Sequence, residues 1–321
     1  MSAASIRPVY LDCDTGVDDA VAIAYLLASP EIELVGIGTV SGNTSATQAA
    51  ENTLRLLALA GRTDIPVAVG SHDHLVDPYG GGVPHIHGDN GIGGVELPAS
   101  HVDPLPESGP EFIVRMAHRY PGELRLIAIG PLTNLALALE LEPRLPELVG
   151  DLTIMGGAAL VAGNASPVAE ANIINDPHAA ELVFAAPWTI TMVGLDATMD
   201  QLIEEDDLER LRSAPGTIAP MLAEMLGIYY DFYVSVFGRP CSALHDPLAV
   251  AISTGEVVPT LAPLVRVTVD ATDGPGRGQT ICDMRGVYNG YPPQRGAHVR
   301  VVLEVDRPYA PLLMDRLLSF A

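Results

Sequence analysis

The segment Leu11–Ala20 contains four aspartates within eight residues: Asp12, Asp14, Asp18 and Asp19. The residues before it, Pro8–Leu11, have the pattern of a short buried strand, and Ala20–Leu27 has the pattern of an apolar helix. In open α/β sheets, ligands bind at this junction of strand end and helix start. Carboxylates crowded there repel one another and lose hydration, and the free N–H groups of a helix start stabilise only some of them. A bound cation is the simplest physical explanation.

Strand-like and helix-like segments alternate along the first 160 residues, and a further helix and strand follow. We expect strands at 8–11, 32–40, 67–69, 124–129, 152–155 and 188–193, and helices at 20–27, 44–60, 111–118, 132–141 and 177–185. Later residues favour helices at 203–213, 216–236, 247–254 and 308–320 and strands at 264–269 and 297–305. This alternation predicts an α/β fold with a mostly parallel central sheet and helices on both faces. Because no linker or repeat interrupts it, we expect residues 1–321 to form a single domain.

Charge and composition exclude several kinds of chemistry. The formal net charge is −23, which argues against a nucleic-acid partner. All 17 basic residues are arginines, so a Schiff-base lysine, a phosphate-binding P-loop lysine and a lysine general base are impossible. No apolar run is long enough to span a bilayer, and the amino terminus does not resemble a signal peptide. The three cysteines, far apart in sequence, lead us to expect a reduced, cytoplasmic protein.

Polar residues follow each predicted strand, where a buried core would not accept them. They lie at 12–19, 41–43, 130–134, 156–172 and 244–247. Taken singly, each has an ordinary structural interpretation: Asp176 before Pro177 and Asp246 before Pro247 both fit a helix N-cap, and His245 fits a structural histidine. Because the carboxyl ends of parallel strands share one edge of a sheet, we expect these segments to converge there.

Several of these segments also form recognisable motifs. They read DCDTGVDDA at 12–20, GN at 42–43, HGDNG at 87–91, GPLTN at 130–134, MGG at 155–157, GNASPVAEAN at 163–172 and HDPLA at 245–249. In this order they resemble the calcium-dependent, inosine-uridine preferring nucleoside N-ribohydrolases over most of the chain. Thr15 stands where these enzymes usually have proline, a change that the turn tolerates.

The resemblance implies a Rossmann-like fold with one Ca²⁺ at the carboxyl edge of the sheet. Its ligands would be the side chains of Asp14, Asp19 and Asp246 and the backbone carbonyl of Thr133, completed by water and two ribose hydroxyls. Carboxylate and carbonyl oxygens suit a hard cation of this size. Asp14 would also act as the general base toward the attacking water, and Asp12 would have a supporting, structural role.

The resemblance also assigns the substrate contacts. The ribose would be held by Asp18, Asn43, Asn164, Glu170 and Asn172. His245 would assist the departing base, with His87 as a second candidate on the base side. The expected reaction is hydrolysis of the N-glycosidic bond of a ribonucleoside by a homodimer or homotetramer, with no nucleic-acid or membrane partner. Aromatic residues of the 224–240 segment could stack on the base or form the core face of a helix.

Two alternatives remain open from the sequence. A haloacid dehalogenase-type phosphatase also begins with Asp-x-Asp after its first strand, but such enzymes use a later lysine, which this chain lacks. A Ca²⁺-dependent nucleoside- or ribose-binding protein without turnover would share the metal site. Turnover of a riboside distinguishes the hydrolase from both.

Overall fold

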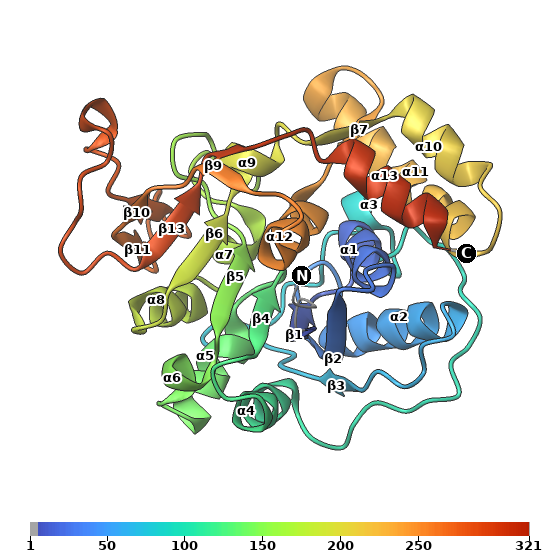
Figure 1. Cartoon of the computed structure of the whole chain (residues 1–321), viewed down its shortest axis with the longest axis horizontal. Helices are drawn as coiled ribbons and strands as arrows, with labels where there is room; N and C mark the ends of the chain where they lie inside the picture. The colour runs from blue at the N-terminus through green and yellow to red at the C-terminus, as the bar shows by residue number, and fades with distance from the viewer. Residues whose placement is uncertain (1–5, 321) are drawn as a thin grey trace, which may run out of the picture.

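A computed structural model describes residues 6–320 and is built around an eight-stranded sheet (Figure 1). The strand order is β10-β13-β6-β5-β4-β1-β2-β3, and only the edge strand β10 runs antiparallel to its neighbour. The strands of this sheet are β1 (Arg7–Cys13), β2 (Ile32–Thr39), β3 (Val67–Val69), β4 (Arg125–Ala128), β5 (Asp151–Met155), β6 (Ile190–Val193), β10 (Leu264–Val265) and β13 (Val299–Val302). The predicted mostly parallel α/β sheet is confirmed.

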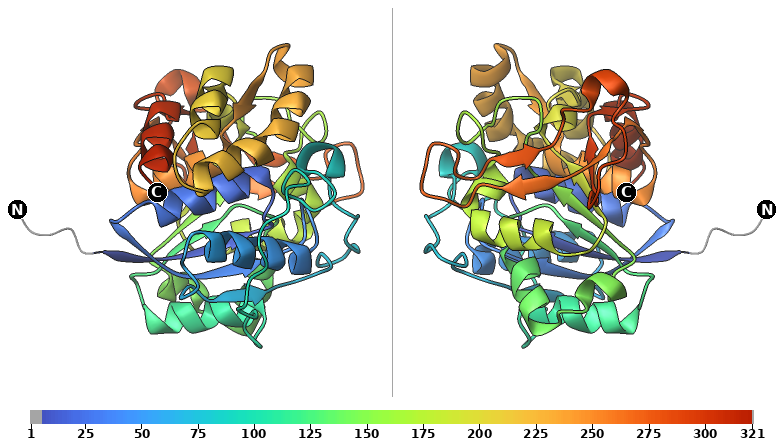
Figure 2. Two further views of the ribbon diagram at one scale, coloured as in Figure 1. Left: turned by 90° about the vertical axis from the view of Figure 1, so that its right-hand side faces the viewer. Right: turned by 90° about the vertical axis from the view of Figure 1, so that its left-hand side faces the viewer.

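Helices cover both faces of the sheet, as Figure 2 shows with the sheet edge-on between two layers. One buried core lies under α1 (Val17–Leu27), α2 (Ala46–Leu59), α10 (Glu205–Arg212), α11 (Ile218–Phe237), α12 (His245–Thr254) and α13 (Ala310–Ser319). The other lies under α4 (Gly109–Arg119), α5 (Thr133–Leu141) and α8 (Pro177–Ala185). The short helices are α3 (Pro84–His87), α6 (Leu145–Leu148), α7 (Ala171–Asn175), α9 (Leu195–Thr198) and the 3₁₀ turn η1 (Val287–Asn289).

Strand β1 shows how the two-residue period of a strand sorts side chains between these cores. Val9, Leu11 and Cys13 face the α1 side, whereas Tyr10 belongs to the opposite core. Asp12 alternates with Leu11 and Cys13, and its carboxylate accepts a hydrogen bond of 2.9 Å from Asn134 Nδ2 of α5. This contact agrees with a supporting role for Asp12.

The structure differs from the expected elements in three respects. Helix α1 begins at Val17 rather than Ala20, so Asp18 and Asp19 lie in its first turn instead of in the preceding loop. The expected strands 264–269 and 297–305 are each divided between two sheets. The sequence did not predict three short antiparallel strand pairs. They are β7 (Leu202–Glu204) with β8 (Cys241–Ala243), β11 (Val267–Val269) with β12 (Thr280–Cys282), and β9 (Pro259–Leu261) with β14 (Glu304–Val305).

The antiparallel β11–β12 pair leaves the edge of the large sheet and packs beside α8. Within residues 6–320, no helix combines the length and apolar character needed to cross a membrane.

The polar motifs of the chain converge at one edge of the large sheet, which is formed by the carboxyl ends of its parallel strands.

Candidate active site

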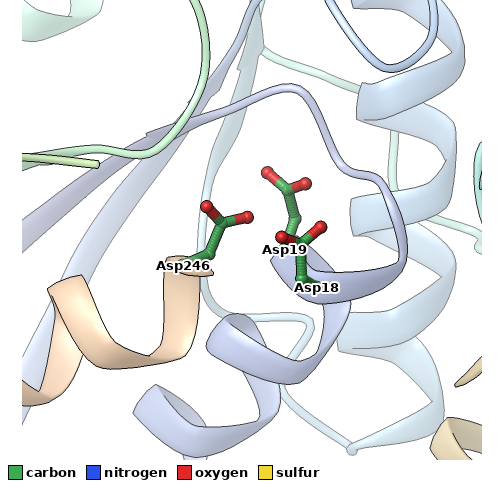
Figure 3. Close-up of side chains that lie close together, drawn as sticks. All are labelled: Asp18, Asp19 and Asp246. Atoms are coloured by element: carbon green, nitrogen blue, oxygen red, sulfur yellow. The ribbon is translucent and has the colours of Figure 1, made fainter. Parts of the chain in front are cut away.

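Three buried carboxylates meet at the carboxyl edge of the sheet. Asp18 and Asp19 lie in the first turn of α1, and Asp246 lies in the first turn of α12, which packs against α1. One oxygen of each carboxylate lies within 4.8 Å of the others. Figure 3 shows the three side chains arriving from the two helices at one place. Asp19 and Asp246 are two of the predicted metal ligands, and the structure places Asp18, a predicted ribose contact, beside them.

Asp14 lies beside this cluster, directly after β1. Its Oδ2 accepts a 2.7 Å hydrogen bond from the backbone N–H of Asn43, and its own N–H donates to Asp19 Oδ1 at 3.2 Å. Asn43 also contacts Asp19, since its side-chain Nδ2 donates to Asp19 Oδ2 at 3.1 Å. A Cβ on Gly42 would lie 2.1 Å from Asp14 Oδ2, so only glycine lets the chain pass this close.

Asp14 and the three carboxylates of the cluster repel one another because they are buried close together and carry the same charge. Burial, and next the charge of Asp19, raises the pKa of Asp18 to about 7 and the pKa of Asp14 well above its usual value. Burial and the neighbouring Asp18 carboxylate raise the pKa of Asp246 in the same direction. Asp14 Oδ1 and Asp18 Oδ1 are buried and have no hydrogen-bond partner among the described residues. Buried carboxylate oxygens without a hydrogen-bond partner form a donor set that fits a hard divalent cation.

Thr133, the fourth predicted ligand, is the first residue of α5 and is fully buried. Its hydroxyl donates a 2.7 Å hydrogen bond to Asp176 Oδ2, while Asp176 Oδ1 accepts from Ala179 N and caps α8. The predicted N-cap role of Asp176 is thereby confirmed. The Thr133 hydroxyl is thus engaged by Asp176, and the Thr133 backbone carbonyl as a metal ligand stays a prediction.

The GNASPVAEAN segment is fixed against the sheet edge by its own polar groups. Glu170 caps α7, its Oε1 accepting from Asn172 N at 2.8 Å and its Oε2 from Gly157 N at 3.0 Å. Asn172 Nδ2 donates to the carbonyl of Ile129 at 2.8 Å, and Asn164 Oδ1 accepts from Ala171 N at 3.0 Å. Glu170 and Asn172 are buried. The segment therefore lies beside the ends of β4 and β5, with these contacts setting its shape.

The two predicted histidines lie next to the cluster, since His245 precedes Asp246 in α12 and His87 contacts the start of α1. His245 Nε2 is 2.6 Å from the Tyr233 hydroxyl, and Nδ1 is 2.8 Å from the Thr198 hydroxyl. His87 Nδ1 accepts a 3.0 Å hydrogen bond from Val17 N at the start of α1. Burial lowers the pKa of His245 to about 4 and, together with His245, the pKa of His87 to about 3. Both rings are therefore neutral at neutral pH.

Aromatic side chains of α11 surround these histidines. Tyr229 lies 5.2 Å from the His87 ring and 5.1 Å from Tyr233, measured between ring centroids. After burial, the charge of Asp18 is the next cause that raises the pKa of Tyr229 well above its usual value, so Tyr229 lies near the acidic cluster. The four-residue spacing of Tyr229, Tyr233 and Phe237 indicates a shared helix face in the sequence, but no sequence pattern identified Thr198 as their neighbour.

Comparison with known proteins agrees with this arrangement. Residues 9–310 match the family described as inosine-uridine preferring nucleoside hydrolase. The chain is 38% identical to a probable uridine nucleosidase 2 of Arabidopsis thaliana, covering 99% of this chain and 100% of that one. It is 36% identical to an inosine-uridine preferring nucleoside hydrolase of Crithidia fasciculata, covering 97% of each.

Solved structures of nucleoside hydrolases share the fold. A plant nucleoside hydrolase aligns with a TM-score of 0.90 at 33% identity, over 98% of this chain and 99% of that one. A purine-preferring ribonucleoside hydrolase from Gardnerella vaginalis aligns with a TM-score of 0.89 at 34% identity over the same shares. The chain therefore belongs to the inosine-uridine preferring nucleoside hydrolase family and is an enzyme that hydrolyses the N-glycosidic bond of ribonucleosides.

Proposed function

We propose that this enzyme uses a Ca²⁺ ion at the acidic cluster to cleave ribonucleosides into ribose and free base. The observation that carries the proposal is the set of buried carboxylates of Asp18, Asp19 and Asp246, with unpartnered oxygens on Asp18 and neighbouring Asp14. Such a set is unstable unless it is protonated or holds a cation.

The proposed ligands are Asp14, Asp19, Asp246 and the Thr133 carbonyl. An all-oxygen set with several carboxylates favours calcium over zinc, which prefers histidine and cysteine ligands. When bound, the ion supplies positive charge that orients and acidifies the attacking water and grips the sugar hydroxyls. Asn43 stabilises the ligands, because it donates to both Asp14 and Asp19.

Asp14 is the proposed general base. Its Oδ2 is held by Asn43 N, which leaves Oδ1 free to accept a proton from the attacking water. Because this oxygen is buried, it is poorly solvated and gains more from taking a proton than an exposed carboxylate would.

The ribose is the proposed partner of five polar side chains: Asp18, Asn43, Asn164, Glu170 and Asn172. Breaking the N-glycosidic bond builds positive charge on C1′ and the ring oxygen, and an acidic site stabilises that charge. The backbone hydrogen bonds of Glu170 and the carbonyl contact of Asn172 keep these side chains in place before the sugar arrives. A 2′-deoxyriboside lacks one gripped hydroxyl and should be a poor substrate.

His245 is the proposed side chain that assists the departing base, and His87 is a second proposed contact to the base. With its pKa lowered to about 4, His245 is neutral at pH 7 and stabilises the base by hydrogen-bond donation rather than from a stored proton. Relatives named uridine nucleosidase and inosine-uridine preferring nucleoside hydrolase suggest uridine and inosine as the first substrates to test.

The test is steady-state release of base from uridine, inosine, adenosine, guanosine and cytidine, with calcium and after its removal by a chelator. Asp14→Ala should lower turnover by roughly 10²- to 10⁴-fold, the usual range for a general base, while the protein stays folded. Asp103→Asn, at an exposed aspartate outside the site, is the matched control. Near-normal turnover by Asp14→Ala, or chelator-resistant turnover, would refute the mechanism; calcium-dependent nucleoside binding without turnover would support the binding-protein alternative.

A further inference from the structure

The loop of residues 71–83 crosses the carboxyl edge of the sheet and is held there at several points. Asn134 Oδ1 accepts from Ser71 N at 2.9 Å, and Asp176 Oδ2 accepts from Leu75 N at 3.0 Å. Asp77 pairs with Arg277 at 2.5 Å, which ties the loop to the β11–β12 connection, 200 residues further along the chain. The loop therefore reaches the site in a defined position.

Tyr79 is the tyrosine of this loop, and its ring is held by contacts within the loop. Its backbone N–H donates to Asp73 Oδ1 at 3.0 Å, and its ring packs edge-on against His72 with centroids 5.3 Å apart. The glycines that follow, Gly80 and Gly81, have open space where a side chain would stand. The direction of the Tyr79 ring is thus set by its contacts within the loop.

The Tyr79 hydroxyl lies beside the residue that organises the acids. A Cβ on Gly82 would be 2.6 Å from the Tyr79 hydroxyl oxygen and 2.5 Å from the Asn43 carbonyl oxygen. Asn43 in turn donates to Asp14 and Asp19. After burial, the charge of Asp14 is the further cause that raises the pKa of Tyr79, which agrees with this placement. Among the described residues, the hydroxyl has no hydrogen-bond partner.

We propose that Tyr79 is a sugar-binding residue whose hydroxyl donates a hydrogen bond to a ribose hydroxyl of the bound nucleoside. The inference rests on the proposed function and adds a contact to it. Ionised carboxylates only accept hydrogen bonds, whereas each sugar hydroxyl also has a lone pair that needs a donor. The aromatic and histidine side, which faces the base in the proposed function, is formed by other elements, α3, α11 and α12. The phenol of Tyr79 therefore supplies a donor on the acidic side.

The experiment measures binding of D-ribose to the calcium-loaded protein by calorimetry, together with KM and kcat for uridine or whichever riboside is turned over. Tyr79→Phe removes only the hydroxyl. One neutral hydrogen bond corresponds to a roughly 3- to 10-fold weaker ribose Kd, with a similar rise in KM and kcat within about twofold. Tyr288→Phe is the control, since Tyr288 is 96% exposed on the 283–298 loop.

An unchanged ribose Kd in Tyr79→Phe would overturn the inference, as would a wild-type protein that binds no ribose. So would weakening seen in Tyr79→Ala but not in Tyr79→Phe, because the ring alone would then be responsible. Failure of the proposed function is seen separately, as wild-type protein that releases no base from any riboside or does so without calcium. The ratio of ribose Kd values between variant and wild type reports on Tyr79 whether or not base is released from a riboside.

Discussion

The Tyr233 hydroxyl lies 2.6 Å from Nε2 of His245, and the Thr198 hydroxyl occupies the other ring nitrogen at 2.8 Å. These three residues come from α11, α12 and α9. The two hydroxyls orient the imidazole before a substrate binds, and donation to the departing base requires one of these two contacts to be exchanged for the base. Because His245 is the proposed group that assists the departing base, loss of His245 or of its hydroxyl partners should lower the rate of base release.

His245→Ala should lower kcat/KM for uridine or inosine by about 10²-fold or more, the usual loss when a hydrogen-bond donor to charge that develops in the transition state is removed. For p-nitrophenyl riboside, whose leaving group needs no help, the loss should stay below about tenfold. His101→Ala, at an exposed histidine, is the control. Equal losses on the two kinds of substrate would remove His245 from this role.

Tyr233→Phe should lower kcat for the natural nucleoside by roughly 3- to 10-fold, because one hydrogen bond that orients His245 is lost. The matched control is Tyr230→Phe on the same helix, since the Tyr230 hydroxyl donates to the carbonyl of Glu204 instead. Stopped-flow or steady-state assays of both variants decide it. Equal effects of the two substitutions would mean that the Tyr233 hydroxyl only supports the helix.

Removal of calcium should make stability depend on pH in a definite direction. The raised pKa of Asp14, Asp18 and Asp246 means that the folded, ion-free protein binds more protons than the unfolded chain between about pH 4 and 7. The lowered pKa values of His87 and His245 act in the opposite direction below about pH 6.5, but the buried aspartates outnumber them. The free energy of unfolding should therefore fall, on balance, as pH rises through this window. Chelator-treated protein should melt at a lower temperature at pH 7.5 than at pH 5.5.

Added Ca²⁺ should stabilise more at the higher pH, because the ligands must lose their protons to bind it. Differential scanning fluorimetry with and without calcium at both pH values measures this. The control is Asp246→Asn, which should weaken the response to calcium at pH 7.5. A calcium-induced rise in Tm that is the same at both pH values would contradict a site made of these carboxylates.

Glu170→Ala should destabilise the protein by about 2 kcal/mol, because the carboxylate caps α7 and also holds Gly157 N. Glu170→Gln keeps one carbonyl acceptor and should lose less. Urea unfolding of both variants provides the values, with Glu181→Ala at an exposed position of α8 as control. Wild-type stability in Glu170→Ala would show that the cap contributes nothing.

Two aspartates that precede proline show where sequence reasoning was sufficient and where it was not. Asp176 before Pro177 and Asp246 before Pro247 have the same local pattern, which predicts an N-cap at both. Asp176 does cap α8. Asp246 lies inside the first turn of α12 and faces two carboxylates of α1. The difference arises because α12 packs against α1, a contact between segments more than two hundred residues apart.

The sequence alone determined the mostly parallel sheet, most of its strands and the convergence of the polar motifs at one edge. Hydrophobic periodicity and turn residues are local signals, and parallel strands place their carboxyl ends together. Only the tertiary structure decided that Asp18 joins Asp19 and Asp246, that Tyr233 and Thr198 orient His245, and that Tyr79 approaches Asn43. Each of these depends on the packing of helices and loops from distant parts of the chain, and the short strands β7, β8 and β12 exist only through the partners that this packing provides.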